Sequence, residues 1–90
     1  MYYIYILKNR KYEDKIYIGF TNDLKRRVMQ HKSGKNIATR RMRPVDVVYY
    51  EAYKSREDAR NRECQLKQYG NALGHLKRRI SNSLEMIHNT

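Results

Sequence analysis

The sequence predicts an α+β fold in which a small antiparallel or mixed sheet is covered by helices. Three stretches rich in tyrosine, isoleucine and valine have the composition of strands. Three further stretches show helical spacing of apolar residues, so the elements follow the order β-β-α-β-α-α. The 90 residues have room for one domain, with a core over about residues 1–80 and a C-terminal tail beyond Met86 that frays.

The first two strands are expected over residues 2–7 and 16–20, as an antiparallel hairpin across a polar connection. Side chains alternate between the two faces of a strand. The most economical pairing places four isoleucines in the core, namely Ile4, Ile6, Ile16 and Ile18. The opposite face then carries Tyr5, Tyr17 and Gly19 together.

A first helix is expected to follow, with Thr21 or Asn22 as its N-cap and Asp23 in its first turn. Gly34 ends it. Its inward stripe contains Leu24, Val28 and His31. Arg27 lies four residues before His31 and borders the same stripe.

The remainder of the chain supplies the third strand and two helices. A basic loop over residues 35–44 leads into a strand over residues 45–53. Ser55 caps the second helix, which runs to about Tyr69 and stops at Gly70. The apolar stripe of the third helix is formed by Leu73, Leu76, Ile80, Leu84 and Ile87.

Charge and aromatic content point to a nucleic-acid partner. Twenty Lys and Arg against nine Asp and Glu give a formal net charge of +11, and nine of the aromatic residues are tyrosines. Cations bind phosphates and aromatic rings stack on bases. No apolar run is long enough for a membrane helix, and the N-terminus has no features of a signal peptide. The single cysteine, Cys64, excludes an intrachain disulfide, and the expected compartment is the cytoplasm.

The strongest charge run extends from Lys25 to Arg43, with eight Lys or Arg and no acid. Such a run is often only a solvated face. Because it begins within an amphipathic helix, we interpret it as a folded phosphate-binding patch. The expected contacts are Lys25, Arg26, Lys32, Lys35, Arg40, Arg41 and Arg43.

Glu63 is the most informative single residue. It shares a helical stripe with Ala59 and Leu66, which directs its carboxylate inward. One interpretation is a buried ion pair with an arginine. The other is a metal ligand, because Mg²⁺ is often held by few carboxylates with open positions.

Two other side chains have simpler interpretations beside functional ones. His31 could carry a proton or contact a phosphate, although a single histidine at a helix edge more often packs. Cys64 is expected to be an inert, buried or half-buried side chain. His75 and His88 are expected at the surface.

Two tripeptides, Tyr3-Ile4-Tyr5 and Tyr17-Ile18-Gly19, resemble the signature motifs of the GIY-YIG nuclease superfamily. The similarity continues in order through residues 21–27, 43–45, 48–51 and 62–67. It covers residues 1 to about 70 and is closest in kind to the small, free-standing, single-domain bacterial members.

The resemblance implies a three-stranded antiparallel sheet flanked by helices, and hydrolysis of a nucleic-acid phosphodiester with Mg²⁺ or Mn²⁺. Carried over by motif position, the catalytic residues are Tyr5, Tyr17, Arg27, His31 and Glu63, with Glu63 as the metal ligand. Two positions depart from the pattern. Tyr3 replaces the first glycine, and Phe20 stands where several members have a lysine or another polar residue.

The expected mechanism assigns one task to each of these residues. Arg27 holds the phosphate, and a metal on Glu63 stabilises the phosphoryl and leaving oxygens. Either Tyr5 or Tyr17 orients or deprotonates the water, and the central place of Tyr5 in its strand favours Tyr5. His31 relays the proton.

The leading hypothesis is a small DNA endonuclease of repair or processing type. Many members of the family have a separate DNA-binding domain that selects the target, and this sequence shows no counterpart of it. Activity is therefore expected to be weak or to depend on a protein partner. The alternative is a non-catalytic nucleic-acid-binding module that keeps the fold. A purely structural basic protein explains neither Glu63 nor the clustered tyrosines.

Overall fold

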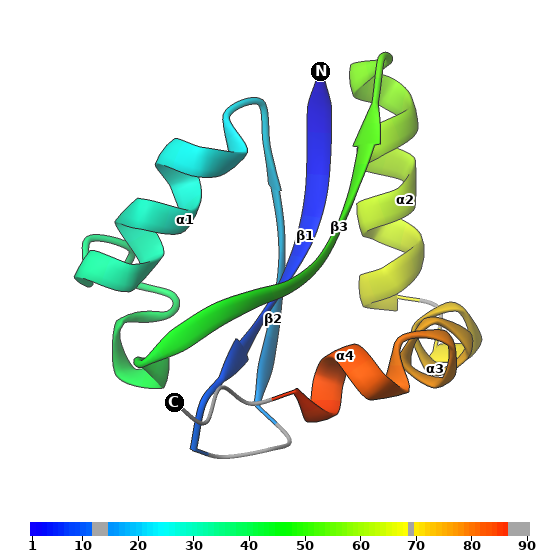
Figure 1. The fold of residues 1–90 in the computed structure, drawn as a ribbon. Coiled ribbons are helices and arrows are strands. Elements are labelled where there is room, and N and C mark those ends of the chain that lie inside the picture. The colour runs from blue at the N-terminus through cyan, green and yellow to red at the C-terminus, as the bar shows by residue number, and fades with distance from the viewer. Residues whose placement is uncertain (12–14, 69, 87–90) are drawn as a thin grey trace.

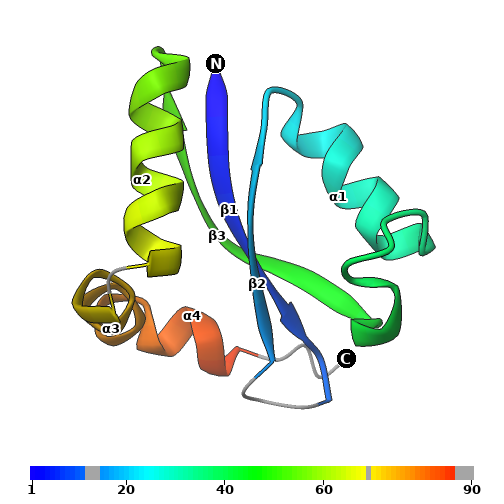
Figure 2. The same ribbon diagram turned by 180° about the vertical axis from the view of Figure 1, so that it is seen from behind.

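The computed structural model describes residues 1–11, 15–68 and 70–86. Its elements are β1 (Tyr2–Asn9), β2 (Ile16–Thr21), α1 (Leu24–Ser33), the 3-10 helix η1 (Arg40–Met42), β3 (Val45–Tyr53), α2 (Arg56–Gln68), α3 (Gly70–Arg79) and α4 (Ser81–Glu85). The strands form one antiparallel sheet in the order β2-β1-β3. The α+β class and the three-stranded antiparallel sheet are therefore confirmed, and Figures 1 and 2 show α1 and α2 flanking this sheet on opposite sides.

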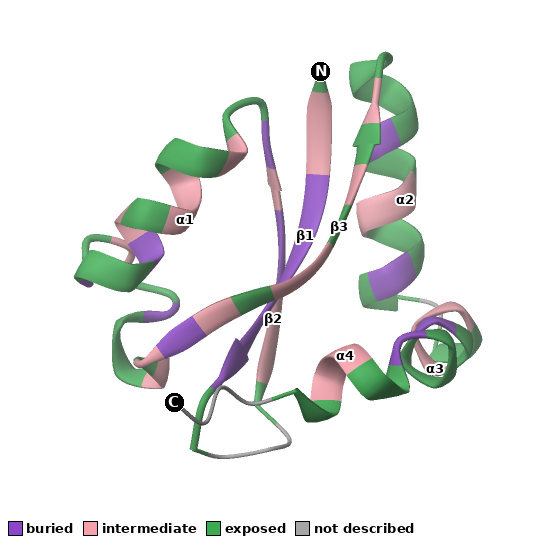
Figure 3. Cartoon of the chain, viewed as in Figure 1, coloured by how far each residue is buried: buried purple, intermediate pink, exposed green. Residues whose placement is uncertain are grey.

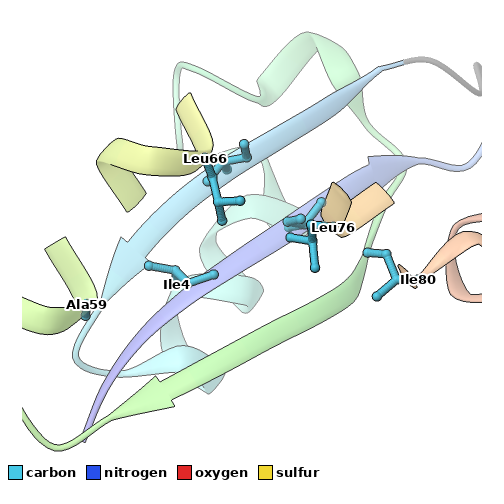
Figure 4. Close-up of a cluster of buried hydrophobic side chains, with 7 residues drawn as sticks. Ile4, Ala59, Leu66, Leu76 and Ile80 are labelled. Carbon is cyan, nitrogen blue, oxygen red and sulfur yellow. The ribbon is translucent and has the colours of Figure 1, made fainter. Parts of the chain in front are cut away.

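The register of the hairpin separates isoleucines from tyrosines as predicted. Ile6 pairs with Ile18, and Tyr5 pairs with Gly19. The isoleucine face is covered by α2, α3 and α4. Figure 4 shows Ile4 of β1 facing Ala59 and Leu66 of α2 and Leu76 and Ile80 further along the chain. In Figure 3 the buried segments accordingly follow β1 and the inner sides of the helices.

The tyrosine face forms a second, smaller cluster. Tyr5, Leu7 and Val45 are buried there, and the half-buried side chains packed against them are Tyr17, Leu24 and Met42. Leu24 belongs to α1 and Met42 to η1, so the helix and the basic loop close this face. The two faces thus place the hydrophobic core on one side and the tyrosines beside the basic segment on the other.

Gly19 is required by the close approach of a tyrosine ring. A Cβ at this position would overlap the ring of Tyr5, with Cε1 at only 2.8 Å and two other atoms closer still. No side chain can be accommodated there without moving Tyr5. The third residue of the second tripeptide therefore leaves free the space that the ring of Tyr5, in the first tripeptide, occupies.

The boundaries of α1 correct one prediction. Asp23, not Thr21 or Asn22, is the N-cap, since its side chain accepts a hydrogen bond from the backbone N–H of Arg26. Thr21 instead accepts a hydrogen bond from the backbone N–H of Asp23. The end of the helix at Gly34 is confirmed, with a left-handed φ of 84°.

The C-terminal part corrects a second prediction. The expected third helix is two helices, α3 and α4, which are separated at Ile80. The chain changes direction there, yet Leu76, Ile80 and Leu84 all still pack on the core. The apolar stripe therefore predicted the buried side chains correctly, but the prediction of one continuous helix was wrong. Gly70 begins α3, while Ser55 caps α2 as predicted, accepting from the N–H of Asp58. Tyr69, Ile87, His88 and the tail beyond Met86 lie outside the described residues.

Among the described residues, no helix is long and apolar enough to cross a membrane.

Candidate active site

A cavity of about 440 Å³ opens between α1, α2 and the outer edge of β2. Its walls are mostly polar and consist of Tyr2, Tyr17, Phe20, Thr21, Asn22, Arg27, Arg56, Arg60 and Glu63. Three of the predicted catalytic residues meet here: Tyr17 from β2, Arg27 from α1 and Glu63 from α2. The cavity combines a phenol, a guanidinium and a carboxylate that are far apart in the sequence.

Tyr5 is placed behind this cavity and has no exposed surface. Its ring lies 6.3 Å from the ring of Tyr17 and 5.6 Å from that of His31, measured between centroids. Burial, assisted by the neighbouring Tyr17 and Glu63 and opposed by Arg27, raises the pKa of Tyr5 to about 12. As placed, Tyr5 does not line the cavity walls.

His31 is also fully buried, between two hydroxyl groups. Its Nε2 lies 2.7 Å from the Tyr5 hydroxyl, and its Nδ1 lies 2.6 Å from Oγ1 of Thr39. Burial and the nearby charge of Arg27 lower the pKa of His31, so the neutral ring is favoured. A neutral imidazole has one donor and one acceptor nitrogen, and each hydroxyl can take either role, so both nitrogens are satisfied. His31 thus joins β1, α1 and the basic loop.

Arg27 lies between the buried tyrosine cluster and the open cavity. Its side chain is half-buried, and it lines the cavity. Its charge and its hydrogen bond oppose the rise in the pKa of Tyr5, and its charge contributes to the lowered pKa of His31. A permanently charged group in this position can hold an anion in the cavity and influence both buried rings at once.

Glu63 combines features of both predicted interpretations. Its side chain is only 12% exposed, and its two oxygens lie 3.1 Å from Nη1 of Arg60 and 3.0 Å from Nζ of Lys67. Both partners belong to α2 itself, and their side chains are 48% and 47% exposed. The carboxylate is therefore paired, but with half-exposed cations of its own helix and not with a buried arginine from another element.

The donor set fits a hydrated divalent cation. The described residues contain no group of three or more His, Cys, Asp or Glu that could enclose a metal ion. Mg²⁺ keeps several waters and is commonly held by one or two carboxylates together with substrate phosphates. A single carboxylate that opens onto a cavity, as Glu63 does, satisfies this requirement.

Among the described residues, a different ion pair has both of its charged side chains mostly buried, and it joins β3 to α2. Glu51 of β3 accepts hydrogen bonds from Nε and Nη2 of Arg62, the latter at 3.1 Å. The hydroxyls of Tyr49 and Tyr53 donate to the same carboxylate. Burial alone would raise the pKa of Glu51, but these hydrogen bonds outweigh it and lower the pKa. Sequence reasoning did not identify this cluster, although the alternation of Tyr49, Glu51 and Tyr53 places all three on one face of the strand.

The predicted phosphate-binding residues lie on α1 and the loop that follows it. All seven are exposed: Lys25, Arg26, Lys32, Lys35, Arg40, Arg41 and Arg43. Their charges remain largely accessible, since the ion pair found for them joins Lys32 to Asp46 at 3.9 Å, and Arg40 donates to the carbonyl of Gly34. The run is thus an ordered surface beside the cavity wall formed by Arg27.

Two further expectations are resolved by exposure. Cys64 is exposed, so the expected burial of this thiol was wrong. Its position one residue after Glu63 turns it away from the stripe that contacts the sheet. His75 is exposed as predicted, and it contacts Arg78 of the same helix.

Six of the nine wall residues were not predicted from the sequence, and three of them matter most: Phe20 as a support, and Arg56 and Arg60 as cations. The two arginines had a signal in the helical spacing, because Arg56, Arg60 and Glu63 follow one another at intervals of four and three. Thr39 was missed as well. No local pattern marks it, since its partner His31 is reached only through the fold of the loop.

Comparison with known proteins identifies the family. The model of the GIY-YIG catalytic domain matches residues 1–79. A UPF0213 protein of Bacillus pumilus is 39% identical over 73% of this chain and 66% of its own length. UPF0213 proteins of Clostridium perfringens and Staphylococcus epidermidis are 37% and 35% identical, over 74% and 76% of this chain and 71% and 82% of their own lengths. No solved structure matches. The GIY-YIG superfamily consists of nucleases, which act on nucleic acid and generally use a divalent metal. The chain belongs to the GIY-YIG nuclease family.

Proposed function

We propose that this protein is a divalent-metal-dependent endonuclease that hydrolyses phosphodiester bonds of DNA, in repair or processing. One observation carries the proposal: a single cavity is lined by Tyr17, Arg27 and Glu63, which come from three different elements. Phosphodiester hydrolysis needs a positioned water, a cation at the phosphoryl oxygens and a stabilised leaving oxygen. A phenol, a guanidinium and a metal-binding carboxylate supply groups for these tasks.

Arg27 is proposed to hold the scissile phosphate. Its guanidinium is permanently charged, and its N–H donors match two phosphate oxygens. It is half-buried, so its charge acts in a partly desolvated environment, where electrostatic stabilisation is stronger than in water. Glu63 is proposed to hold Mg²⁺ or Mn²⁺, which when bound supplies Lewis-acid stabilisation of the oxygens that gain charge.

Of the two tyrosines, we assign the water to Tyr17. Tyr17 lines the cavity and is half-buried, whereas Tyr5 has no exposed surface and a pKa raised to about 12. A group that takes a proton from water must reach that water, which favours the exposed phenol. Tyr5 and His31 are proposed to act as positioning residues, because their rings pack against Tyr17 and each other.

The exposed cations of residues 25–43 are proposed to bind the flanking phosphates. They adjoin Arg27 along the same helix and loop, and they contribute charge but no sequence readout. We place the protein in the cytoplasm as a single nuclease domain, and we propose that a protein partner supplies its target.

A non-catalytic nucleic-acid-binding module is the second candidate. The observation that favours it is the pairing of both Glu63 oxygens with Arg60 and Lys67, which leaves a metal in competition with two cations. Such a protein would keep the basic surface and bind nucleic acid without cleaving it.

Nicking of supercoiled plasmid distinguishes the two candidates. The purified protein is incubated with plasmid in Mg²⁺, in Mn²⁺ and in a chelator, beside Glu63→Gln. The proposed endonuclease nicks in metal only, and the Glu63→Gln variant does not nick. If the wild-type protein binds the supercoiled plasmid but does not nick it in either metal, the result would support the binding module instead.

A further inference from the structure

Two arginines of α2 contact the face of one aromatic ring at the cavity. The guanidinium carbon of Arg60 lies 3.9 Å from the centroid of Phe20, and that of Arg56 lies 5.7 Å from it. The ring of Tyr2 stacks beside Phe20 at 6.2 Å between centroids, with an interplanar angle of 19°. Phe20, stacked beside Tyr2, thus forms an aromatic surface against which the two guanidinium groups pack.

Arg60 is held by a second contact as well. Its Nη1 lies 3.1 Å from Oε1 of Glu63. A guanidinium has five N–H donors, so this contact leaves donors for a further acceptor. The side chain is 48% exposed and lines the cavity, which makes those donors reachable by a ligand. Arg60 is therefore ordered before any ligand arrives, and less conformational entropy is lost on binding.

The charges of the cavity wall favour an anion. The wall has three arginines, Arg27, Arg56 and Arg60, against the single carboxylate of Glu63. Arg27 approaches from α1 and Arg60 from α2, so the two cations flank the cavity from opposite sides. A nucleic-acid strand presents regularly spaced phosphates, and two cations on opposite walls suit two of them.

We propose that Arg60 is a second phosphate-binding residue of this site, seated on Phe20 and acting across the cavity from Arg27. The inference rests on the proposed function, since it assumes that a nucleic-acid strand occupies the cavity. Phe20 fixes the guanidinium by its ring face, and Glu63 fixes it by one N–H. Arg60 then binds the backbone phosphate next to the one that Arg27 holds.

Lys67 shows that Arg60 is not needed merely to neutralise Glu63. Lys67 pairs with the other oxygen of Glu63 at 3.0 Å, is exposed to the same extent and comes from the same helix. It does not line the cavity wall, and within the described ranges no aromatic ring lies under its charge as Phe20 lies under that of Arg60. It is thus a matched control, which has the ion pair of Arg60 without its place in the cavity.

The test is the salt dependence of DNA binding, measured by fluorescence anisotropy on a short duplex in a chelator so that no cleavage occurs. Each phosphate contact contributes about 0.9 to the slope of log K against log[salt] on duplex DNA. Arg60→Ala is expected to reduce the magnitude of the slope by about 1. Lys67→Ala is expected to leave the slope at the wild-type value. Phe20→Leu keeps the charge, so it should preserve the slope and weaken binding only about two- to fivefold.

The proposal would be overturned if the salt slope of Arg60→Ala equalled that of the wild-type protein. It would also be overturned if Lys67→Ala reduced the slope as much as Arg60→Ala does, because Arg60 would then act through Glu63. A wild-type protein that binds no DNA would overturn it too. Arg60→Gln serves as the same test if Arg60→Ala does not fold, as judged by its thermal melt. Nicking of plasmid by the wild-type protein is scored separately, so a protein that binds through Arg60 but does not cleave refutes only the endonuclease.

Discussion

Replacing Glu63 with glutamine keeps the volume of the side chain and removes its charge. The structure assigns this carboxylate two ion pairs, with Arg60 at 3.1 Å and with Lys67 at 3.0 Å. Both cations are about half exposed and lie on the same helix as Glu63. Solvent and salt therefore screen these pairs, and each cation can turn to water when the carboxylate is lost.

The expected loss of stability follows from this exposure. Exposed helix pairs of this kind contribute about 0.3–0.5 kcal/mol each, so the two together contribute at most about 1 kcal/mol. In a domain of this size, 1 kcal/mol corresponds to roughly 4–8 °C in Tm. The single carbonyl oxygen of glutamine can still accept from one of the two cations, and the other cation can turn to water, so Glu63→Gln is expected to lower the Tm by no more than this.

Glu51→Gln provides the contrast within the same protein. The carboxylate of Glu51 is bound by two nitrogens of Arg62 and by the hydroxyls of Tyr49 and Tyr53, and the two charged side chains are only 17% and 23% exposed. Breaking such a pair from one side leaves a poorly solvated charge and costs about 3–5 kcal/mol. Glu51→Gln is therefore expected to reduce stability several times more than Glu63→Gln.

The assay is thermal unfolding followed by circular dichroism, with and without Mg²⁺ or Mn²⁺. A ligand that binds only the folded state raises the Tm. Metal is expected to raise the Tm of the wild-type protein and of Glu51→Gln, and to leave that of Glu63→Gln unchanged. A drop in Glu63→Gln as large as in Glu51→Gln, together with no metal effect on the wild type, would refute the metal site at Glu63 and favour the binding module.

Three further predictions concern the basic surface and the buried ring cluster. Arg27→Ala is expected to reduce plasmid nicking by about two to three orders of magnitude while weakening DNA binding only slightly, because it removes the cation at the reacting phosphate and leaves the rest of the surface. Arg26 is the exposed neighbour of Arg27 on the same helix, so Arg26→Ala should retain most of the nicking activity. Equal losses of activity in the two variants would show that both arginines are surface contacts only. Residues 25–43 are expected to neutralise about five phosphates, which gives a slope of about −4 to −5 for log K against log[salt] on duplex DNA, and salt-insensitive binding would exclude this surface. Since burial and then the charge of Arg27 lower the folded-state pKa of His31, the neutral ring contributes stability above its unfolded value of about 6.5, and this contribution is lost as the pH falls toward the folded-state value. Urea unfolding from about pH 7.5 to about pH 5.5 should therefore show a larger loss for the wild type than for His31→Gln, and identical pH profiles would contradict it.

Local pattern was enough to predict the sheet and its two faces. Alternation in residues 2–7 and 16–20 is a local property of extended chains, so it predicted which side chains share a face before any pairing was known. The spacing of Ala59, Glu63 and Leu66 likewise predicted an inward-facing carboxylate, because the period of a helix is fixed by its own backbone. The tripeptides and the later glutamate together were specific enough to indicate the family that the comparison confirmed.

The partners of these residues, by contrast, depend on how distant segments pack together. Helical spacing placed His31 on the inner stripe, but its hydrogen bonds to Tyr5 and Thr39 depend on how the loop folds back over the sheet. The sequence favoured Tyr5 over Tyr17 as the residue that acts on the water, but Tyr5 is fully buried on the central strand β1, whereas Tyr17 on the edge strand β2 lines the cavity. Local pattern determines the direction in which a side chain points, whereas burial, ion pairing and access to a cavity depend on segments distant in the sequence, which only the packing of helices against the sheet brings together.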